Sequence, residues 1–203
     1  MSPQPTPLDD VLVVAVLAGG EGRRMGGIKA LRPFHARPLV AHAVELARHW
    51  SDRVVVAVRD PAQVAGAVDA PLTLDRAGIP GPLAGLAGAL EYARSLGGGR
   101  LLTLPCDMPR LPRDLADRLA AAMGAEHKVA LPAIDGQLQP VCGLWQVTAL
   151  DQLPAYVASG QSSLRGFAAA CGLAVVEFGA EAALAFTGAN TPEELERLAR
   201  ETP

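Results

Sequence analysis

Short β-branched apolar runs alternate along the chain with helical patterns, and this alternation limits the possible folds more than any other feature. Residues 11–17 form an unbroken apolar run that ends in Ala18-Gly19-Gly20, which is typical of a strand buried on both faces of a parallel sheet. We expect strands at 11–17, 53–58, 72–74, 100–104, 129–134, 141–145 and 174–177, and helices at 39–48, 82–95, 112–123, 148–158, 162–170 and 191–200. This order predicts an α/β fold, a single three-layer α/β/α domain with a mainly parallel sheet.

The length and the cysteines indicate an ordinary globular domain. A chain of 203 residues can bury a sizeable core without disulfides or a structural metal. Residues 1–10 contain three prolines and no periodicity, so we expect a flexible leader followed by one domain over 11–203. Cys106, Cys142 and Cys171 are odd in number and widely spaced, which is typical of reduced thiols in a cytoplasmic protein.

Charge and hydropathy argue against two classes of partner. The formal net charge is −3, without the basic excess that nucleic-acid binding usually needs. Mean hydropathy is positive, but the purest apolar run, residues 11–20, is about half the length of a membrane span. Asp9 and Asp10 precede it, where a secretory signal would carry basic residues. We therefore expect a cytoplasmic protein with no nucleic-acid and no membrane partner.

A glycine-rich basic loop follows the first predicted strand. Between Leu17 and Lys29 the chain carries five glycines and three basic residues. Closely spaced glycines let backbone N–H groups surround an anion, and Arg24 and Lys29 add charges that suit a polyphosphate. Lys29 lies between Ile28 and Ala30, so the segment is not a P-loop, and the third glycine of a dinucleotide-binding fingerprint is missing. The alternative is a strand-to-helix turn with solvated arginines.

A second candidate site residue follows the predicted strand at 100–104. Asp107 is flanked by Pro105 and Pro109, and a carboxylate held at a strand end suits Mg²⁺, which takes few protein ligands and keeps water and phosphate oxygens. Ligands of such sheets bind at the carboxyl ends of strands, so we expect Asp107 to lie opposite the glycine-rich loop. The alternative is an Asp that only forms a turn between prolines. Cys106 has no histidine partner close in sequence and is expected to be a buried packing residue rather than a nucleophile.

The glycine-rich loop also carries a family resemblance. Residues 17–29 read Leu-Ala-Gly-Gly-x-x-x-Arg-Met-Gly-Gly-x-Lys, and this resembles the signature loop of nucleotidyltransferases, most closely that of the molybdenum cofactor guanylyltransferases. Further segments are similar to that family in the same order, at 81–86, 104–109, 140–145 and 190–195. The resemblance spans about residues 11–199, nearly the whole chain.

The resemblance implies a Rossmann-like nucleotidyltransferase fold and a Mg²⁺-dependent enzyme. Such an enzyme transfers GMP from GTP to molybdopterin-bound molybdenum cofactor, forms the guanine dinucleotide and releases pyrophosphate. The resemblance implies Arg24, Lys29 and Asp107 as catalytic residues, with Asp107 as the metal ligand. The GTP-binding residues that it implies are Leu17, Ala18, Gly19, Gly20, Lys29, Asp75, Gly81 and Asp107. GTP and the molybdopterin cofactor would be its substrates, and molybdoenzyme maturation proteins its protein partners. For Asp75, a helix or turn cap is the alternative.

Three single residues depart from the family's pattern, and so do Gly188 and Ala189 before Asn190. Ile28 stands where an acid often precedes the loop lysine, Ala57 where an asparagine often follows the second strand, and Gln139 where a histidine often precedes the proline of the Gly-Leu-Trp segment. Two alternatives therefore stay open: a cytidylyltransferase acting on the same cofactor, and a non-catalytic protein that binds nucleotide or cofactor. The presence of both Lys29 and Asp107 argues against the second alternative.

Overall fold

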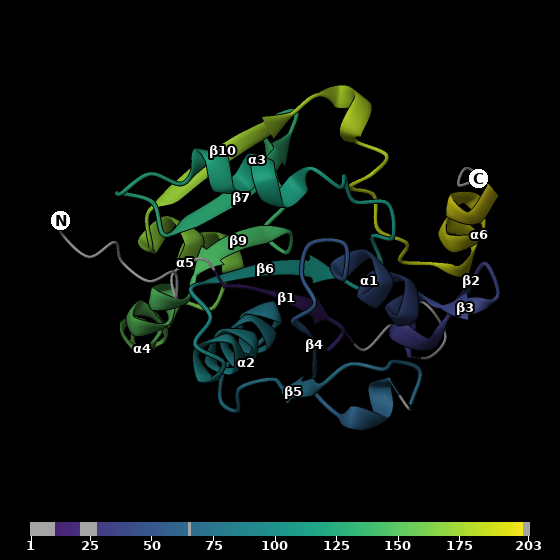
Figure 1. Cartoon of the computed structure of the whole chain (residues 1–203), viewed down its shortest axis with the longest axis horizontal. Coiled ribbons are helices and arrows are strands. Elements are labelled where there is room, and N and C mark those ends of the chain that lie inside the picture. The colour runs from purple at the N-terminus through teal and green to yellow at the C-terminus, as the bar shows by residue number, and fades with distance from the viewer. Residues whose placement is uncertain (1–10, 21–27, 65, 201–203) are drawn as a thin grey trace, which may run out of the picture.

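The structure is a computed structural model that describes residues 11–20, 28–64 and 66–200, and these build a sheet between two layers of helices (Figure 1). The sheet strands are β1 (Leu12–Leu17), β4 (Val54–Val58), β5 (Leu72–Leu74), β6 (Arg100–Pro105), β7 (Val129–Ile134), β8 (Gln137–Leu138), β9 (Gly143–Gln146) and β10 (Leu173–Phe178). The α-helices are α1 (Leu39–Ala47), α2 (Pro82–Ser95), α3 (Leu115–Ala122), α4 (Leu153–Ala158), α5 (Leu164–Ala170) and α6 (Pro192–Arg200). This confirms the predicted three-layer α/β architecture.

Parallel pairing around β1 gathers several strand ends at one edge of the sheet. The strand order is β10-β7-β9-β6-β1-β4-β5, with β8 paired to β7. Leu17, the last residue of β1, lies opposite Ala57 on β4 and Pro105 on β6, both in parallel register. β5 continues in parallel from β4. The segments that follow β1, β4, β5 and β6 therefore emerge on the same side of the sheet.

One reversed strand interrupts the mainly parallel sheet. β9 runs antiparallel to both β6 and β7. No helix lies between β7 and β9, because the chain turns back through β8 at Asp135 and Gly136, both with positive φ. The alternation of strands and helices that predicts parallel pairing is absent from this stretch, so the chain reverses direction here.

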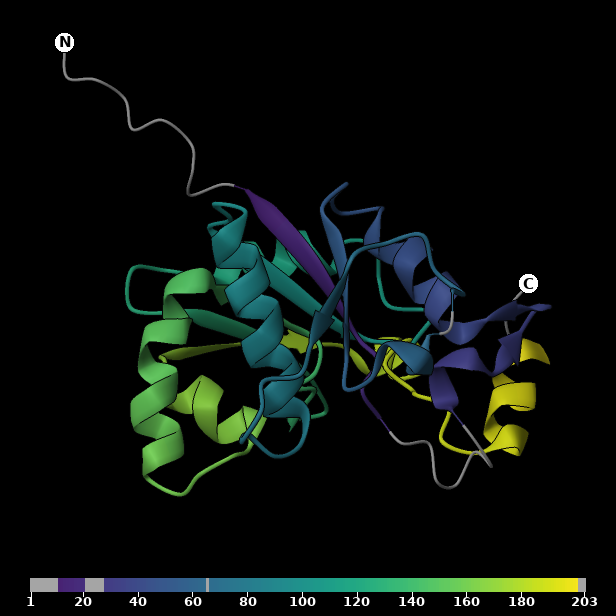
Figure 2. The same ribbon diagram turned by 90° about the horizontal axis from the view of Figure 1, so that it is seen from below.

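Alternate residues of β1 face the two helical layers. Val14 and Val16 belong to a core shared with α1 and α3, while Val13 and Ala15 belong to a core shared with α2, α4 and α5. Figure 2 shows α2 in front of the sheet when the molecule is seen from below. Burial on both faces explains why the sequence of β1 is apolar without alternation.

Helix α6 packs away from the main sheet, on the two-stranded hairpin of β2 (Pro33–Phe34) and β3 (Arg37–Pro38) (Figure 1). A small apolar cluster joins them, made of Phe34, Leu39, Ala189, Leu195 and Leu198. The sequence predicts α6 but not the hairpin, because two-residue strands that each contain a proline carry no periodicity. The cluster fixes the start of α6 beside the segment that follows the glycine-rich loop.

The other predicted elements are confirmed with shifted ends. The helix expected at 112–123 begins at Leu115. The helix expected at 148–158 starts as the 3₁₀ helix η5 (Val147–Gln152) and becomes α4 at Leu153, with Pro154 in the first turn. Proline is well tolerated there because the first-turn N–H groups have no partner within the helix.

Two sequence expectations relate to the leader and to membranes. The expected flexible leader, residues 1–10, lies outside the described residues. Within the described ranges, no helix is both long and apolar enough to cross a membrane.

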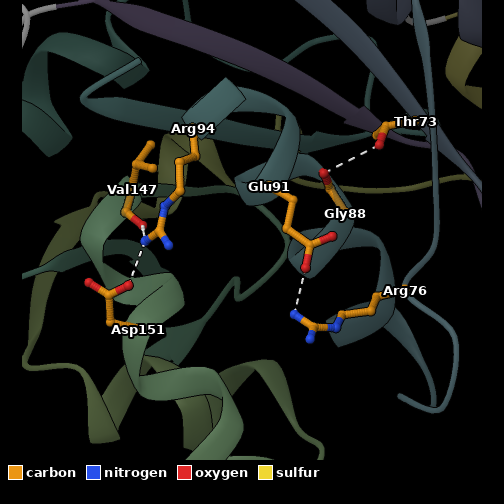
Figure 3. Close-up of polar contacts among 7 residues, drawn as sticks. All are labelled: Thr73, Arg76, Gly88, Glu91, Arg94, Val147 and Asp151. Carbon is orange, nitrogen blue, oxygen red and sulfur yellow. Dashed lines mark hydrogen bonds and ion pairs between the residues drawn. The ribbon is translucent and has the colours of Figure 1, made fainter. Parts of the chain in front are cut away.

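Side-chain hydrogen bonds and ion pairs connect α2 with β5, the segment after β5 and η5 (Figure 3). Thr73 Oγ1 donates a hydrogen bond to the Gly88 carbonyl oxygen at 3.3 Å. Arg76 pairs with Glu91 at 2.5 Å, and Arg94 pairs with Asp151 at 2.7 Å while also donating to the Val147 carbonyl. The ion pairs are exposed and contribute little to stability. The close backbone approach at Gly88 is therefore the main constraint on how α2 lies against β5.

We predict that Gly88→Ala destabilises the protein. Alanine normally favours a helix by about 1 kcal/mol over glycine. Here a Cβ at position 88 would lie 2.2 Å from the Leu74 carbonyl oxygen, so α2 must shift away from β5. We expect the free energy of unfolding, measured by urea denaturation, to fall by about 1–3 kcal/mol. Ser95→Ala, at the exposed end of the same helix, is the control and should change it little; an increase for Gly88→Ala would contradict the packing described.

Candidate functional site

A cavity of about 500 Å³ opens at the edge where β1, β4, β5 and β6 end. It is lined by Leu17, Ala18, Gly19, Gly20, Lys29, Ala57, Arg59, Asp75, Gly81, Pro82, Gly85, Pro105, Cys106, Asp107, Met108, Val141, Gly188 and Asn190. The structure thus brings together eight of the nine candidate residues, namely Leu17, Ala18, Gly19, Gly20, Lys29, Asp75, Gly81 and Asp107. The ninth, Arg24, lies outside the described residues.

Lys29, Asp107 and Asn190 form one hydrogen-bonded cluster in this cavity. The Lys29 ammonium forms an ion pair with Asp107 Oδ2 and donates to Asn190 Oδ1 at 2.8 Å. Only 15% of the Lys29 side chain and 14% of the Asp107 side chain are exposed. The pair brings together the two charges that the sequence places after β1 and β6, at one wall of the cavity.

Asn190 belongs to a segment noted in the sequence, but no pattern there indicated its role. The Asn190 backbone N–H donates to Glu194 Oε2 at 2.7 Å, and the Glu194 N–H donates to Thr191 Oγ1 at 3.2 Å. The Thr191 hydroxyl thus caps an N–H group of the first turn of α6, while the Glu194 side chain holds the backbone of Asn190 just before the helix. The capped start of α6 thereby holds the Asn190 amide against Lys29, a contact between residues 161 positions apart in the chain.

Asp75 directly follows β5 and lines the cavity beside Gly19 and Gly85. A Cβ on Gly19 would be 2.7 Å from Asp75 Oδ2, and a Cβ on Gly85 would be 3.2 Å from Oδ1. Oδ1 is buried and has no hydrogen-bond partner among the described residues. Burial raises the pKa of the Asp75 carboxyl, and the positive charge of Arg59 partly offsets this. The two glycines thus leave space for a carboxylate whose Oδ1 has no donor in the part of the chain that the structure describes.

Asp75 does not cap the helix that follows it. The N-cap of α2 is Gly81, and no side chain caps it. A buried carboxylate oxygen without a donor costs folding free energy and calls for a specific explanation. Asp75 lines the cavity, so the N–H donors of a bound ligand would lie close to this carboxylate.

Gly81 is a position that requires glycine. Its φ of 68° and ψ of −161° lie in a region that other residues essentially never adopt. This turn brings the backbone to the cavity directly before Pro82, the first residue of α2. The N-terminal end of α2 therefore lies beside the lining, where the helix dipole favours an anion.

Cys106 lines the cavity but is not a nucleophile at neutral pH. Only 6% of it is exposed. Burial, followed by the negative charge of Asp107, raises the pKa of its thiol to about 12. The reactive thiolate is therefore scarce near pH 7, which agrees with the packing role expected from the sequence.

The residues that line the cavity suit a hard cation whose remaining ligands come from a bound substrate. Among the described residues, no group of three or more His, Cys, Asp or Glu side chains could hold a metal ion by itself. Mg²⁺ is commonly bound by one or two carboxylates, with waters and substrate phosphates completing its coordination. Asp107 supplies one such carboxylate at the cavity wall, so the residues present are compatible with a metal that arrives with a nucleotide.

The departures from the family pattern at Ala57, Ile28 and Gln139 fall in different places in the structure. Ala57 is buried on β4 and lines the cavity, so an amide is absent there. Arg59, two residues later, supplies a polar side chain to the same cavity. It is not among the residues predicted from the sequence, although its position directly after a strand could have indicated it. Ile28 is 39% exposed, and neither it nor Gln139 is among the lining residues.

Comparison with known proteins gives consistent matches. Residues 14–175 match the family model described as a MobA-like NTP transferase domain. A molybdenum cofactor guanylyltransferase of Cereibacter sphaeroides is 40% identical over 184 residues, covering 90% of this chain and 92% of that protein. A protein of the same name from Bordetella pertussis is 38% identical, covering 90% and 94%.

Solved structures share the fold. The structure of molybdopterin-guanine dinucleotide biosynthesis protein A from Archaeoglobus fulgidus superposes with a TM-score of 0.74 at 23% identity, covering 93% of this chain and 97% of that one. A CMP:2-keto-3-deoxy-manno-octonic acid synthetase superposes with a TM-score of 0.69 at 16% identity, covering 94% and 97%. At these identities the likeness is one of fold.

Proposed function

Since the chain belongs to the family of MobA-like NTP transferase domains, we propose that it transfers GMP from GTP to the phosphate of the molybdopterin cofactor and releases pyrophosphate. The full-length relatives named molybdenum cofactor guanylyltransferase support this reaction, since they cover about nine-tenths of the chain. The buried cluster of Lys29 and Asp107 in the cavity is the observation that carries the proposal. It joins a cation for phosphate and a carboxylate for a metal, the two charges that nucleotidyl transfer needs.

The lining of the cavity divides into two parts. Gly19, Gly20 and Lys29 come from the loop after β1, where backbone N–H groups and an ammonium suit a triphosphate. Asp75 and Gly81 come from the segment between β5 and α2, which would hold the nucleoside. Arg24, in the same glycine-rich loop, would add a second positive charge to the phosphates.

In the reaction, an oxygen of the acceptor phosphate forms a bond to the α-phosphorus of GTP. The bond from that phosphorus to the α,β-bridging oxygen breaks, and its electron pair leaves with pyrophosphate. The acceptor oxygen is already anionic, so no general base is needed. Catalysis then consists of positioning and charge stabilisation. Lys29 would donate hydrogen bonds to the phosphates, and the Asn190 amide would fix its direction.

Asp107 would hold Mg²⁺ together with the nucleotide. The bound ion would offset the phosphate charge as two anions approach each other. In the structure the Asp107 carboxylate accepts from Lys29, so its charge stays balanced when no metal is bound.

The unpartnered Asp75 oxygen would select guanine. A carboxylate accepts hydrogen bonds from two neighbouring N–H donors. Guanine presents such a pair at N1 and at its 2-amino group, whereas cytosine presents a single amino group on its pairing edge. GTP would therefore supply the donor that Asp75 Oδ1 lacks among the described residues.

The compartment and the partners follow from the same chemistry. The three cysteines are buried and free, which suits the reducing cytoplasm. The product is a cofactor that other proteins must receive, so molybdoenzyme maturation proteins would be the partners of this enzyme.

We predict that Asp107→Asn folds normally yet loses GMP transfer. Asparagine has nearly the same shape and keeps an oxygen that accepts from Lys29, but the negative charge that favours a cation is gone. With GTP, Mg²⁺ and molybdenum cofactor, the wild-type protein should release pyrophosphate and form the dinucleotide. We expect the variant to be slower by about 100-fold, or ~2.7 kcal/mol.

The control for Asp107→Asn is thermal stability. A melting temperature close to that of the wild type would exclude a purely structural effect. Near wild-type rates in a well-folded variant would refute the metal role of Asp107. Transfer from CTP in preference to GTP by the wild-type protein would refute the guanylyl assignment while leaving the reaction class intact.

We predict that Asp75→Asn raises the melting temperature of the ligand-free protein at pH 7 but weakens GTP binding. The folded-state pKa of Asp75 is raised, so its ionisation disfavours the folded state as pH rises through that pKa, and an amide removes this cost. Asparagine keeps one acceptor oxygen but places an N–H group against a second guanine donor, so GTP binding should weaken by about 100-fold. The GTP-induced rise in melting temperature measures this loss.

Xanthosine triphosphate separates base reading from general damage by the Asp75→Asn variant. Xanthine has an oxygen in place of the 2-amino group, so an asparagine amide can donate to it. We expect Asp75→Asn to gain affinity for this nucleotide while losing affinity for GTP. Asp135→Asn, an exposed carboxylate outside the cavity, is the matched control. Equal losses for both nucleotides would show that Asp75 does not contact the base.

A further inference from the structure

A second, smaller cavity lies next to the first. It measures about 240 Å³ and is lined by residues that include Arg110, Thr187, Gly188, Glu194, Arg197 and Leu198. These come from the loop after β6, the segment after β10 and helix α6. Pockets that hold a whole ligand usually measure ~300–1,000 Å³, so this cavity suits one part of a larger ligand.

Gly188 joins the two cavities, since it lines both. A Cβ at position 188 would lie 2.8 Å from Asp107 Oδ2, so the chain passes directly against the Asp107 carboxylate. The Ala189 N–H also donates to the Asp107 carbonyl oxygen at 3.3 Å. The second cavity therefore begins beside the carboxylate at which transfer would occur.

The charges of the second cavity suit an anion. Two guanidinium groups, of Arg110 and Arg197, line it with one carboxylate, of Glu194. The Glu194 carboxylate already accepts from the Asn190 N–H at 2.7 Å. Arg197 is exposed on α6, and Arg110 Nη2 approaches the Leu184 carbonyl oxygen at 3.4 Å. The positive charge thus exceeds the negative charge in this lining.

We propose that this second cavity binds the acceptor of the transfer reaction, with its phosphate at Gly188 and its remaining body between Arg110 and Arg197. This assignment rests on the proposed function. The nucleotide would occupy the first cavity from Asp75 to Asp107, so an acceptor that attacks its α-phosphate needs an adjoining space on the Asp107 side. The acceptor is a phosphate monoester and carries negative charge. The two arginines would flank the acceptor and offset part of its overall negative charge, as Lys29 would do for GTP.

The test compares Michaelis constants for the two substrates. Arg197→Ala removes an exposed side chain from α6 and leaves the apolar cluster under the helix intact. We expect the KM for molybdenum cofactor to rise by about tenfold, while the KM for GTP changes less than twofold. Arg197→Lys should restore part of the loss because it keeps the charge. Arg110→Gln should repeat the result from a different element.

Arg200→Ala is the matched control. Arg200 lies on the same helix, pairs with Glu196 at 3.8 Å and is not among the lining residues. Both KM values should stay unchanged in this variant. If Arg197→Ala and Arg110→Gln also left the KM for the cofactor unchanged, or raised both KM values equally, the assignment of the cavity would be overturned.

Direct binding separates this inference from the proposed function. Anaerobic equilibrium dialysis with cofactor released from a molybdoenzyme, in the absence of GTP, measures acceptor affinity without turnover. Binding by the wild type that weakens in Arg197→Ala supports the cavity even if no GMP is transferred, in which case only the proposed function fails. Transfer at wild-type KM by the arginine variants leaves the function standing and refutes the cavity. No binding by the wild type refutes the cavity as well.

Discussion

The ion pair between Lys29 and Asp107 is the contact on which the site depends, because it joins two strand ends that only the parallel sheet brings together. β1 pairs in parallel with β6, so the loop after β1 and the turn after β6 emerge side by side. Asn190 adds a third segment through its bond to Lys29. Both charges of the pair are largely buried, and unpaired buried charges are costly. The cluster therefore requires either its present partners or ligands that replace them.

Burial of charge also links stability to the proposed function at Asp75. Gly19 and Gly85 leave just enough room for its carboxylate, yet no group in the described residues donates to Oδ1. Burial of this charge lowers stability, and under the proposed function the N–H donors of a bound nucleotide would offset that cost. Proteins commonly carry such destabilising groups where they bind ligands.

Much of the fold and of the candidate site could be predicted from local patterns. β1 is apolar because both its faces are buried, and Asp107 stands out because it follows an apolar strand between prolines. The β2–β3 hairpin and the role of Asn190 could not be predicted in this way. The hairpin has no periodicity, and Asn190 acquires its role only when α6 packs on Phe34 and Leu39. Both features arise from contacts between distant segments, which no local pattern encodes.

Calorimetric titration with GTP and Mg²⁺ tests whether Lys29 binds the nucleotide phosphates, as the proposed function requires. Arg37 provides the comparison, because it follows the same basic segment but pairs with exposed Glu45 at 2.6 Å and is not among the residues that line the cavity. We expect Lys29→Ala to weaken GTP binding by at least about tenfold, or ~1.4 kcal/mol, and Arg37→Ala to leave it within about twofold of the wild type. Equal losses in the two variants would contradict this role of Lys29, since the basic segment would then act only through its overall charge.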